Sequence, residues 1–250
     1  MNHELIAVYF MWKREVIRFL RAKSRIIGTL GFPFFFLAVI GSGLNSAMAI
    51  PGMDYMDFIA PGILAMVILF GSVFSGVIVI MDRQFGFLKE TLVAPVSRLS
   101  IIAGKSLGGA TTAIIQGLLM LMIAVLLGVE LQWTNLPLTV LLMALVSLSF
   151  VSLGIAIASM MEDMHGFQLI INFIIMPMFF LSGALFPLDT APEIIRYISY
   201  ADPLTYAVEA FRFLLTGNSV MPLFLSAGVI VLFLLITTFS AAYLFSRIEE

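Results

Sequence analysis

The sequence predicts an all-α membrane protein with six transmembrane helices. Of its 250 residues, 61% are hydrophobic and only 11% are charged, whereas about 25% of the residues in an ordinary soluble domain are charged. The apolar residues gather in six charge-free stretches, each long enough as a helix to cross about 30 Å of hydrocarbon. These stretches are continuously apolar rather than alternating, which favours helices over a β-barrel. They cover residues 26–45, 58–81, 106–128, 137–161, 167–187 and 220–246.

Composition and missing motifs exclude several classes of protein. A net charge of −2 provides no basic surface for nucleic acid. Without cysteine the chain has no disulfide or thiolate chemistry. No G-x-x-x-x-G-K-[ST], H-E-x-x-H or G-x-S-x-G motif is present, and His3 and His165 have no companions at metal-ligand spacing. We therefore expect no catalytic residue, no metal site and no cofactor held by this chain.

The positions of the charges predict the orientation of the chain. All lysines and arginines except Arg196 and Arg212 lie before the first span, in the loop 82–105 or in the C-terminal tail. Because basic residues concentrate on the cytoplasmic side, both termini are expected in the cytoplasm. No ionisable residue lies inside the six stretches, which disfavours an ion-coupled carrier.

Residues 4–25 are helical in pattern but too charged to cross a membrane. Arg14, Arg18, Arg21 and Arg25 recur at helical spacing, and this pattern predicts an amphipathic helix at the membrane interface. Its role is open between an anchor for anionic lipid and a docking surface for a cytoplasmic partner, and the two are compatible. The opposite, apolar face is formed by Leu5, Tyr9, Trp12, Val16, Phe19 and Leu20.

The loop 82–105 is longer than a connection between two spans requires. A short helix is expected from Arg83 to Ala94, ended by Pro95. Phe85 and Phe87 would be exposed on this helix, and exposed aromatic residues are typical of a binding surface. The pattern alone leaves open whether the helix binds a partner or packs on the ends of neighbouring spans.

The segment 188–219 mixes charged and aromatic residues on the external side. Pro192 and Pro203 each stand where a helix can begin, so we expect helices at about 192–200 and 203–215. These could dip into the outer leaflet or form an ordinary interfacial loop. Elsewhere, three pairs of small residues at four-residue spacing favour close packing of helices within the subunit: Ser72 and Gly76, Gly104 and Gly108, and Gly154 and Ala158.

Two stretches of the chain resemble a known family. The stretch from Asp82 to Val96, DRQFGFLKETLVAPV, continues to Gly104 and Lys105. It is similar to the signature of the membrane subunits of ABC type-2 exporters, which include drug, nodulation-factor and polysaccharide permeases. The second stretch, PMFFLSGALFP at 177–187 followed by DPLTY at 202–206 and EAFR at 209–212, resembles that family's fifth span and external re-entrant helices.

The resemblance covers essentially the whole chain, with two departures. An acidic residue is common in the family where Lys89 stands, and asparagine often precedes the proline where Asp202 stands. Each departure could alter the preference for a partner or substrate. The resemblance implies one transmembrane domain over 1–250, with re-entrant helices between the fifth and sixth spans.

The family also implies roles for particular residues. The loop helix would be a coupling helix seated on a separate ATP-binding subunit, beside the N-terminal helix, with 162–166 as a secondary contact. The residues implied in ATPase coupling are Arg83, Phe85, Gly86, Phe87, Leu88, Glu90 and Pro95. Those of the interface helix are Trp12, Arg14, Arg18 and Arg21. Those of the external re-entrant segment or gate are Ser182, Gly183, Pro187, Asp202, Pro203, Tyr206, Glu209 and Arg212.

The expected function is therefore that of an exporter permease in the cell (inner) membrane, with ATP and Mg²⁺ bound by the partner ATPase. Two permease protomers would form the substrate path, and a symmetric pair of this chain is allowed. The charge-free spans favour a hydrophobic or amphipathic drug-like cargo, while a lipid-linked saccharide stays open because sugars stack on aromatic rings. An autonomous secondary transporter or channel is the alternative, and it would work without nucleotide.

Overall fold

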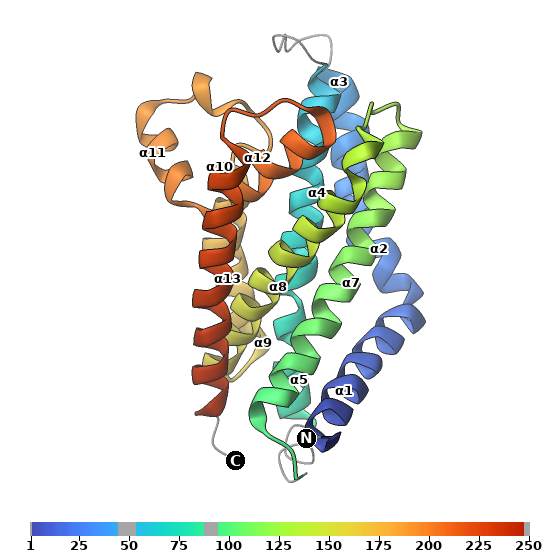
Figure 1. The fold of residues 1–250 in the computed structure, drawn as a ribbon, viewed down its shortest axis with the longest axis vertical. Coiled ribbons are helices and arrows are strands. Elements are labelled where there is room, and N and C mark those ends of the chain that lie inside the picture. Colours follow the sequence, from blue (N-terminus) through green and yellow to red (C-terminus); the bar gives the residue numbers. More distant parts are fainter. Residues whose placement is uncertain (1, 45–53, 88–94, 248–250) are drawn as a thin grey trace.

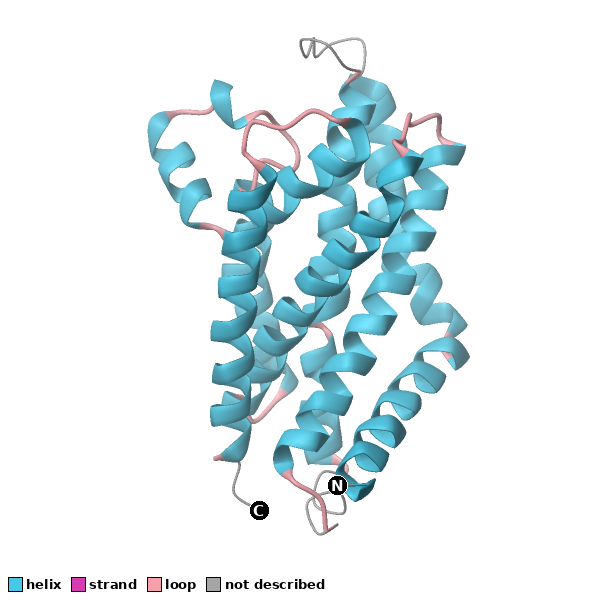
Figure 2. Ribbon diagram, viewed as in Figure 1, coloured by secondary structure: helices cyan, strands magenta, loops and turns pink. Residues whose placement is uncertain are grey.

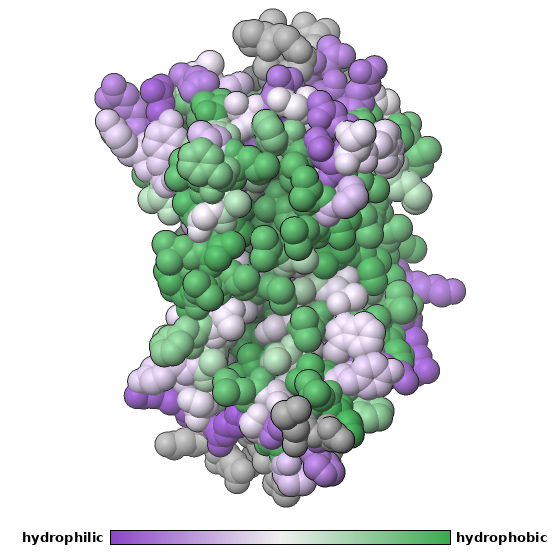
Figure 3. Space-filling view, in the orientation of Figure 1, coloured by the Kyte–Doolittle hydropathy of each residue, from purple (hydrophilic) through white to green (hydrophobic). Residues whose placement is uncertain are grey.

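The computed structural model describes residues 2–44, 54–87 and 95–247, and within these ranges the chain is helical with no strand. Figures 1 and 2 show a bundle of long, roughly aligned helices. Six helical stretches of the described residues are long and apolar enough to cross a membrane, which confirms the six predicted spans. Figure 3 shows the apolar surface as a belt between two more polar ends, as expected for a membrane protein.

Three spans are single helices, and three are interrupted. The single helices are α7 (Arg98–Leu126), α8 (Leu136–Met160), which follows the 3-10 turn η2 (Trp133–Asn135), and α13 (Leu223–Ser246). The first span comprises α2 (Lys23–Phe35), the π-helical turn η1 (Phe36–Gly41) and α3 (Ser42–Leu44). The second comprises α4 (Tyr55–Val73) and α5 (Ser75–Gln84). The fifth comprises α9 (Met164–Ile170), the π-helical turn η3 (Ile171–Ile175) and α10 (Met176–Leu181).

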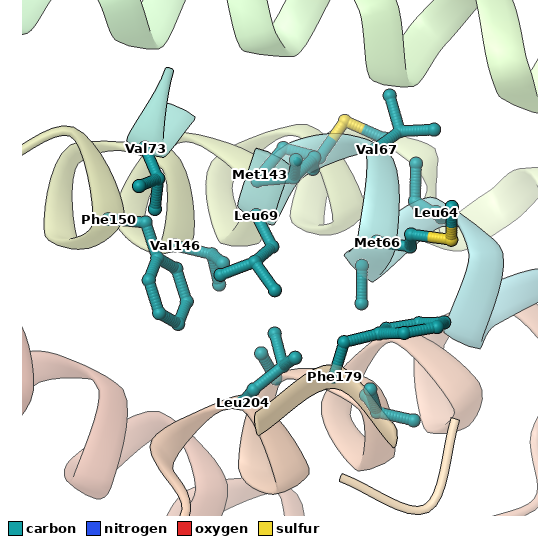
Figure 4. Packing of buried hydrophobic residues seen from close by; sticks show 14 of the residues in the cluster. Leu64, Met66, Val67, Leu69, Val73, Met143, Val146, Phe150, Phe179 and Leu204 are labelled. Carbon is teal, nitrogen blue, oxygen red and sulfur yellow. The ribbon is translucent and has the colours of Figure 1, made fainter. Parts of the chain in front are cut away.

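Helix α4 lies at the centre of the hydrophobic core. It is apolar around its whole circumference, which is typical of a helix surrounded by others, and most of its residues are buried. In Figure 4 the side chains of Leu69 and Val73 lie near Phe150 of α8, and the α10 residue Phe179 and Leu204 lie below α4. The second span is therefore the framework on which the other spans are arranged.

Glycines allow several helices to approach closely. A Cβ atom built on Gly76 of α5 would lie 2.3 Å from the carbonyl oxygen of Gly154 on α8. Likewise, a Cβ atom on Gly104 would lie 2.6 Å from Cβ of Met11, and one on Gly108 would lie 2.6 Å from Cβ of Glu15. No larger residue fits at these distances, which confirms the predicted role of the small-residue pairs in packing within the subunit.

Helix α1 (Asn2–Arg21) packs along one end of α7 (Figure 1). The chain bends at Ala22, where ψ is 64°, so the helix predicted over 4–25 is divided between α1 and α2. The predicted apolar face is divided as well. Phe19 is buried and Trp12 Nε1 donates a hydrogen bond of 3.0 Å to Thr111 Oγ1 of α7, whereas Leu5, Tyr9 and Leu20 are exposed.

The end of the bundle where α1 begins is called the terminal end here. Two contacts define it. Glu4 accepts hydrogen bonds from the backbone N–H and the hydroxyl of Ser97, at 3.0 and 2.8 Å. Arg98 Nη1 donates to the carbonyl oxygen of Ser246 at 2.6 Å. The start of α1, the start of α7 and the end of α13 therefore lie together.

The opposite end carries η4 (Leu188–Thr190), α11 (Glu193–Ala201) and α12 (Pro203–Thr216) (Figure 1). The two predicted short helices are confirmed, each within about one residue of its expected bounds. Helix α12 packs on α4, α8 and α13, and most of its residues are buried. The fifth span ends at Leu181, earlier than expected, because the chain turns at Gly183 with φ of 73°. Re-entry into a membrane stays a prediction.

Candidate functional site

A buried cluster of charged side chains lies at the terminal end, centred on Asp82 of α5. Arg14 of α1 donates two hydrogen bonds to this carboxylate, from Nη2 at 3.0 Å and from Nη1 at 3.4 Å. Lys105 of α7 also bonds to it, and both Asp82 and Lys105 are 4% exposed. Arg18 Nη1 lies 3.7 Å from Asp82 Oδ1. One carboxylate thus joins α1, α5 and α7.

The cluster includes a second buried carboxylate, that of Glu15. Its Oε1 lies 3.7 Å from Arg14 Nη1 and has no hydrogen bond to any described residue. A cavity of about 20 Å³ adjoins it, with Glu15, Lys105 and Gln116 among its lining residues. This is space for about one water molecule. Burial of these charges is tolerated because cations and carboxylates compensate each other.

Sequence reasoning missed this cluster. It treated Asp82 and Lys105 as the two ends of a loop, whereas both lie inside helices, and it placed Arg14 and Arg18 on a face of their own. The structure turns Arg14 and Arg18 toward Asp82, while Arg21 is exposed. The available signal was the acidic residue directly before Arg83, at the end of an otherwise apolar helix.

The first predicted coupling residues lie beside this cluster. Arg83 Nη1 donates to the carbonyl oxygen of Met161 at 3.4 Å, so it contacts the segment directly before 162–166. The Phe85 side chain is 78% exposed. Gly86 adopts φ of 78°, and the ring centroid of Phe87 lies 3.6 Å from the Arg14 guanidinium carbon. The start of the loop therefore contacts both α1 and the end of α8.

The helix expected from Arg83 to Ala94 does not begin at Arg83. Helix α5 continues through Gln84 because its backbone hydrogen bonds persist to Phe85, which donates to the carbonyl oxygen of Met81 at 2.9 Å. Leu88 and Glu90 fall outside the described residues, as does the rest of the expected helix up to Ala94. Pro95 is exposed and precedes Ser97, the N-cap of α7.

The predicted external residues form a second cluster at the opposite end, around Arg212 of α12. Its Nη2 donates to the carbonyl oxygen of Gly183 at 2.9 Å, Nη1 bonds to Glu209, and the guanidinium carbon lies 4.0 Å from the ring centroid of Phe58. Glu209 Oε2 accepts a hydrogen bond of 2.8 Å from the N–H of Val220. This cluster joins α12 to α4, to the end of the fifth span and to the approach to α13.

Other predicted external residues fix the ends of the short helices. Asp202 Oδ1 accepts a hydrogen bond of 2.8 Å from the N–H of Leu204, so Asp202 caps α12, and Pro203 is the first residue of that helix. Burial raises the pKa of the Asp202 carboxyl from its ordinary value of 3.8 to about 7, although the Leu204 hydrogen bond acts in the opposite direction. The Tyr206 hydroxyl donates to the carbonyl oxygen of Tyr200 at 2.9 Å.

Two predicted residues in the preceding turn make local contacts. The Ser182 hydroxyl donates to the carbonyl oxygen of Phe179 at 2.7 Å, and the carbonyl oxygen of Pro187 accepts from the Thr190 hydroxyl at 2.9 Å. Among the described residues, Arg212 bonds to Glu209 and Gly183 and stacks on Phe58, not on the side chain of Ser182 or Pro187. They shape the turn after the fifth span, and the Arg212 cluster holds that turn against α12.

A larger cavity, of about 290 Å³, opens between the two clusters. Its wall is formed by α2, α4, α7 and the fifth span, and its lining includes Gln116, which also lines the small cavity beside Glu15. This cavity could not be predicted from the sequence, because its shape depends on how four separate spans pack.

The fold and its two charged ends define a multi-pass helical membrane protein whose most elaborate polar contacts surround the connection between its second and third spans. Residues 6–216 match the family model described as ABC-2 type transporter. The chain belongs to this family.

Three relatives cover most of this chain. It is 30% identical to the transport permease ycf38 of Cyanophora paradoxa over 217 residues, which are 85% of this chain and 75% of the relative. It is 27% identical to Nodulation protein J of Rhizobium leguminosarum bv. trifolii, covering 95% of this chain and 92% of the relative. It is 26% identical to the inner membrane transport permease YadH of Escherichia coli strain K12, covering 92% and 90%.

Proposed function

We propose that this chain is the membrane subunit of an ATP-driven exporter and that it works with a separate ATP-binding subunit. The observation that carries the proposal is the set of contacts around Asp82, where the start of the loop after α5 meets α1, α7 and the end of α8. Membership of the ABC-2 type family and relatives named transport permeases support it. The terminal end would face the cytoplasm, where the ATPase binds.

In this proposal the chain transmits movement and the chemistry stays on its partner. ATP binding would close a pair of ATPase subunits, which would press on the exposed Phe85 and its neighbours. Because Asp82 is bonded to Arg14 and Lys105, the ends of α5, α1 and α7 would move together as one body. Separating the buried pair of Asp82 and Lys105 would cost about 3–5 kcal/mol, so a joint movement is favoured.

The opposite end would control release of the cargo. The Arg212 cluster holds the turn after the fifth span against α12 and α4, so rearrangement of the spans would displace α12 as well. Two protomers, in the simplest case two copies of this chain, would enclose the path between them. The cargo would be a hydrophobic or amphipathic small molecule, with a lipid-linked saccharide as the second class.

Reconstitution with the co-purifying ATPase tests the proposal. Phe85→Ala is expected to weaken assembly with the ATPase without destabilising the permease alone, because its side chain is exposed. Arg83→Ala is expected to lower the ATP-driven transport rate. Tyr197→Ala is the matched control, since Tyr197 is 72% exposed at the opposite end and its removal should leave assembly unchanged.

Two outcomes would contradict the proposal. Transport at full rate in vesicles without nucleotide would favour an autonomous secondary transporter or channel. Assembly and transport left intact by both Phe85→Ala and Arg83→Ala would show that the start of this loop has no coupling role.

A further inference from the structure

The cavity of about 290 Å³ is lined by uncharged side chains only, among the residues that the structure describes. Aromatic rings from two spans form much of its wall: Phe32 of α2, and Phe70 and Phe74 at the end of α4. Small-molecule sites are mostly apolar and aromatic, with a few polar groups that orient the ligand, and have volumes of about 300–1,000 Å³. The cavity is at the small end of that range.

Three amide side chains supply the polar groups: Gln116 of α7, Gln168 of α9 and Asn172 of η3. Gln168 Nε2 donates to Asn172 Oδ1 at 3.2 Å. This bond leaves the Gln168 carbonyl oxygen as an acceptor and the Asn172 amide nitrogen as a donor, neither of which forms a side-chain hydrogen bond with another described residue. Both side chains are exposed within a membrane span, where an unpaired amide is costly.

The backbone at this position is also unusual. Asn172 belongs to the π-helical turn η3, and Ile171 of the same turn lines the cavity beside it. π-helical turns are rare in proteins overall, but those that do occur are often found at functional sites. A second π-helical turn, η1, interrupts the first span directly after the helix that supplies Phe32 and Pro33 to the cavity wall.

Gln116 separates this cavity from the charged cluster at the terminal end. It is 4% exposed and lines both cavities, as does Gly71. The cations of the cluster, Arg14, Arg18 and Lys105, lie around Asp82, and none of them is among the residues that line the larger cavity. An anionic ligand would therefore enter the larger cavity without a free counter-charge, which is strongly unfavourable.

We propose that this cavity binds a neutral amphipathic small molecule. Its apolar body would lie against Phe32, Phe70 and Phe74, and one amine, hydroxyl or carbonyl group would pair with Gln168 and Asn172. The proposal rests on the export function proposed above and narrows its cargo. The volume and the absence of lining charge favour a compact neutral molecule over an oligosaccharide or an organic anion.

A matched pair of fluorescent probes tests this selectivity. N-phenyl-1-naphthylamine is neutral, and 8-anilinonaphthalene-1-sulfonate carries the same arylamine skeleton with an added sulfonate. Binding is measured on the complete permease–ATPase complex in lipid nanodiscs without nucleotide, with empty nanodiscs subtracted. The neutral probe is expected to bind saturably, and the sulfonate to bind at least about tenfold more weakly because its charge would be buried unpaired.

Two glycines of α2 provide a blocking variant and its control. A Cβ atom on either Gly28 or Gly31 meets nothing within 4 Å, but only Gly28 lines the cavity. Gly28→Leu is expected to reduce the affinity for the neutral probe about tenfold by filling the space. Gly31→Leu introduces the same side chain on the same helix and should leave the affinity unchanged.

The amide is tested separately with Asn172→Leu, which should weaken binding of the neutral probe about fivefold, the effect of one hydrogen bond. Equal binding of the two probes, no saturable binding, or equal affinities in the wild type and Gly28→Leu would overturn the site. If any of these results is found but Gly28→Leu still exports cargo at the wild-type rate with ATP, the site is wrong and the proposed function stands. Conversely, Gly28-dependent binding without any ATP-driven export would leave the site standing and contradict the proposed function.

Discussion

Arg14 and Asp82 lie 68 positions apart in the sequence and are joined by hydrogen bonds of 3.0 and 3.4 Å between α1 and α5. The same guanidinium stacks on Phe87, within the loop that follows α5. Helix α1 is therefore bonded to the last turns of the second span. Its basic residues include one that pairs with a buried carboxylate as well as others that lie on the surface.

The first prediction concerns the charge of Asp82. Asp82→Asn keeps the shape of the side chain but leaves Lys105 buried without a carboxylate partner. Breaking a buried pair on one side costs about 3–5 kcal/mol, so the free energy of unfolding in detergent should fall by about 3 kcal/mol. The change is measured as a shift in the midpoint of thermal unfolding.

Lys105→Met tests whether the loss comes from that unpaired charge. The double variant Asp82→Asn/Lys105→Met removes both partners, and it should be more stable than Asp82→Asn alone. If the free energy of unfolding of the double variant falls by the sum of the decreases in the two single variants, the two side chains act independently.

The second prediction concerns the contact of α5 with α8. Gly76→Ala places a Cβ atom 2.3 Å from the carbonyl oxygen of Gly154, and because that oxygen belongs to the backbone of α8, the two helices have to separate. The expected loss of stability is about 1–3 kcal/mol. Gly228→Ala on α13 is the control, because nothing lies within 4 Å of its Cβ atom, and it should be neutral or slightly stabilising. Equal melting temperatures for the two variants would contradict the close packing.

The third prediction concerns pH. The pKa of the Asp202 carboxyl is about 7 in the folded protein, against an ordinary 3.8, so the folded state retains a proton that the unfolded state has lost. The contribution of this carboxyl to the free energy of unfolding is therefore most favourable below about pH 4, where both states are protonated. It becomes less favourable as the pH rises through about 7, by up to about 4 kcal/mol in total. Asp202→Asn keeps an oxygen to cap α12 and should remove this dependence.

Unfolding midpoints at pH 5 and pH 8 check that expectation. The wild type should lose more stability than Asp202→Asn between these two pH values. The same slope in both proteins would show that another group titrates.

The fourth prediction concerns the planar geometry of Arg212. Arg212→Lys keeps the charge but loses the fork that reaches Glu209 and Gly183 together and stacks on Phe58. We expect a loss of about 2 kcal/mol in the free energy of unfolding. Arg196→Lys is the control at the same end, since Arg196 bonds backbone carbonyls of a partly exposed turn. A larger loss for Arg196→Lys than for Arg212→Lys would be inconsistent with the central role of the Arg212 cluster.

Local signals in the sequence predicted the elements well. The six spans follow from uninterrupted apolar stretches, and α12 begins at Pro203 after the cap Asp202, as its sequence indicates. The small residues Gly76 and Gly154 predicted close helix packing, and the structure shows that they bring α5 and α8 together.

The contacts between elements could not be predicted in the same way. The pairing of Arg14 with Asp82 requires α1 to lie along α7, with the chain bent at Ala22, and this depends on contacts with Gly104 that no local pattern specifies. The larger cavity depends on the π-helical turn at Asn172. The 3.6-residue periodicity of apolar residues predicts α-helices, and it does not indicate where a π-helical turn will form.

The turn η3 (Ile171–Ile175) sets the rotational phase of the fifth span. A π-helical turn holds about one residue more than the α-helical turn it replaces, and each residue advances an α-helix by about 100°. If the same five residues were α-helical instead, α10 would be rotated from its present position, which would carry Phe179 away from Phe70, whose ring centroid lies 6.3 Å away. The wide turn therefore allows Gln168 and Asn172, in the first half of the fifth span, to line the cavity while Phe179, in the second half, packs in the core.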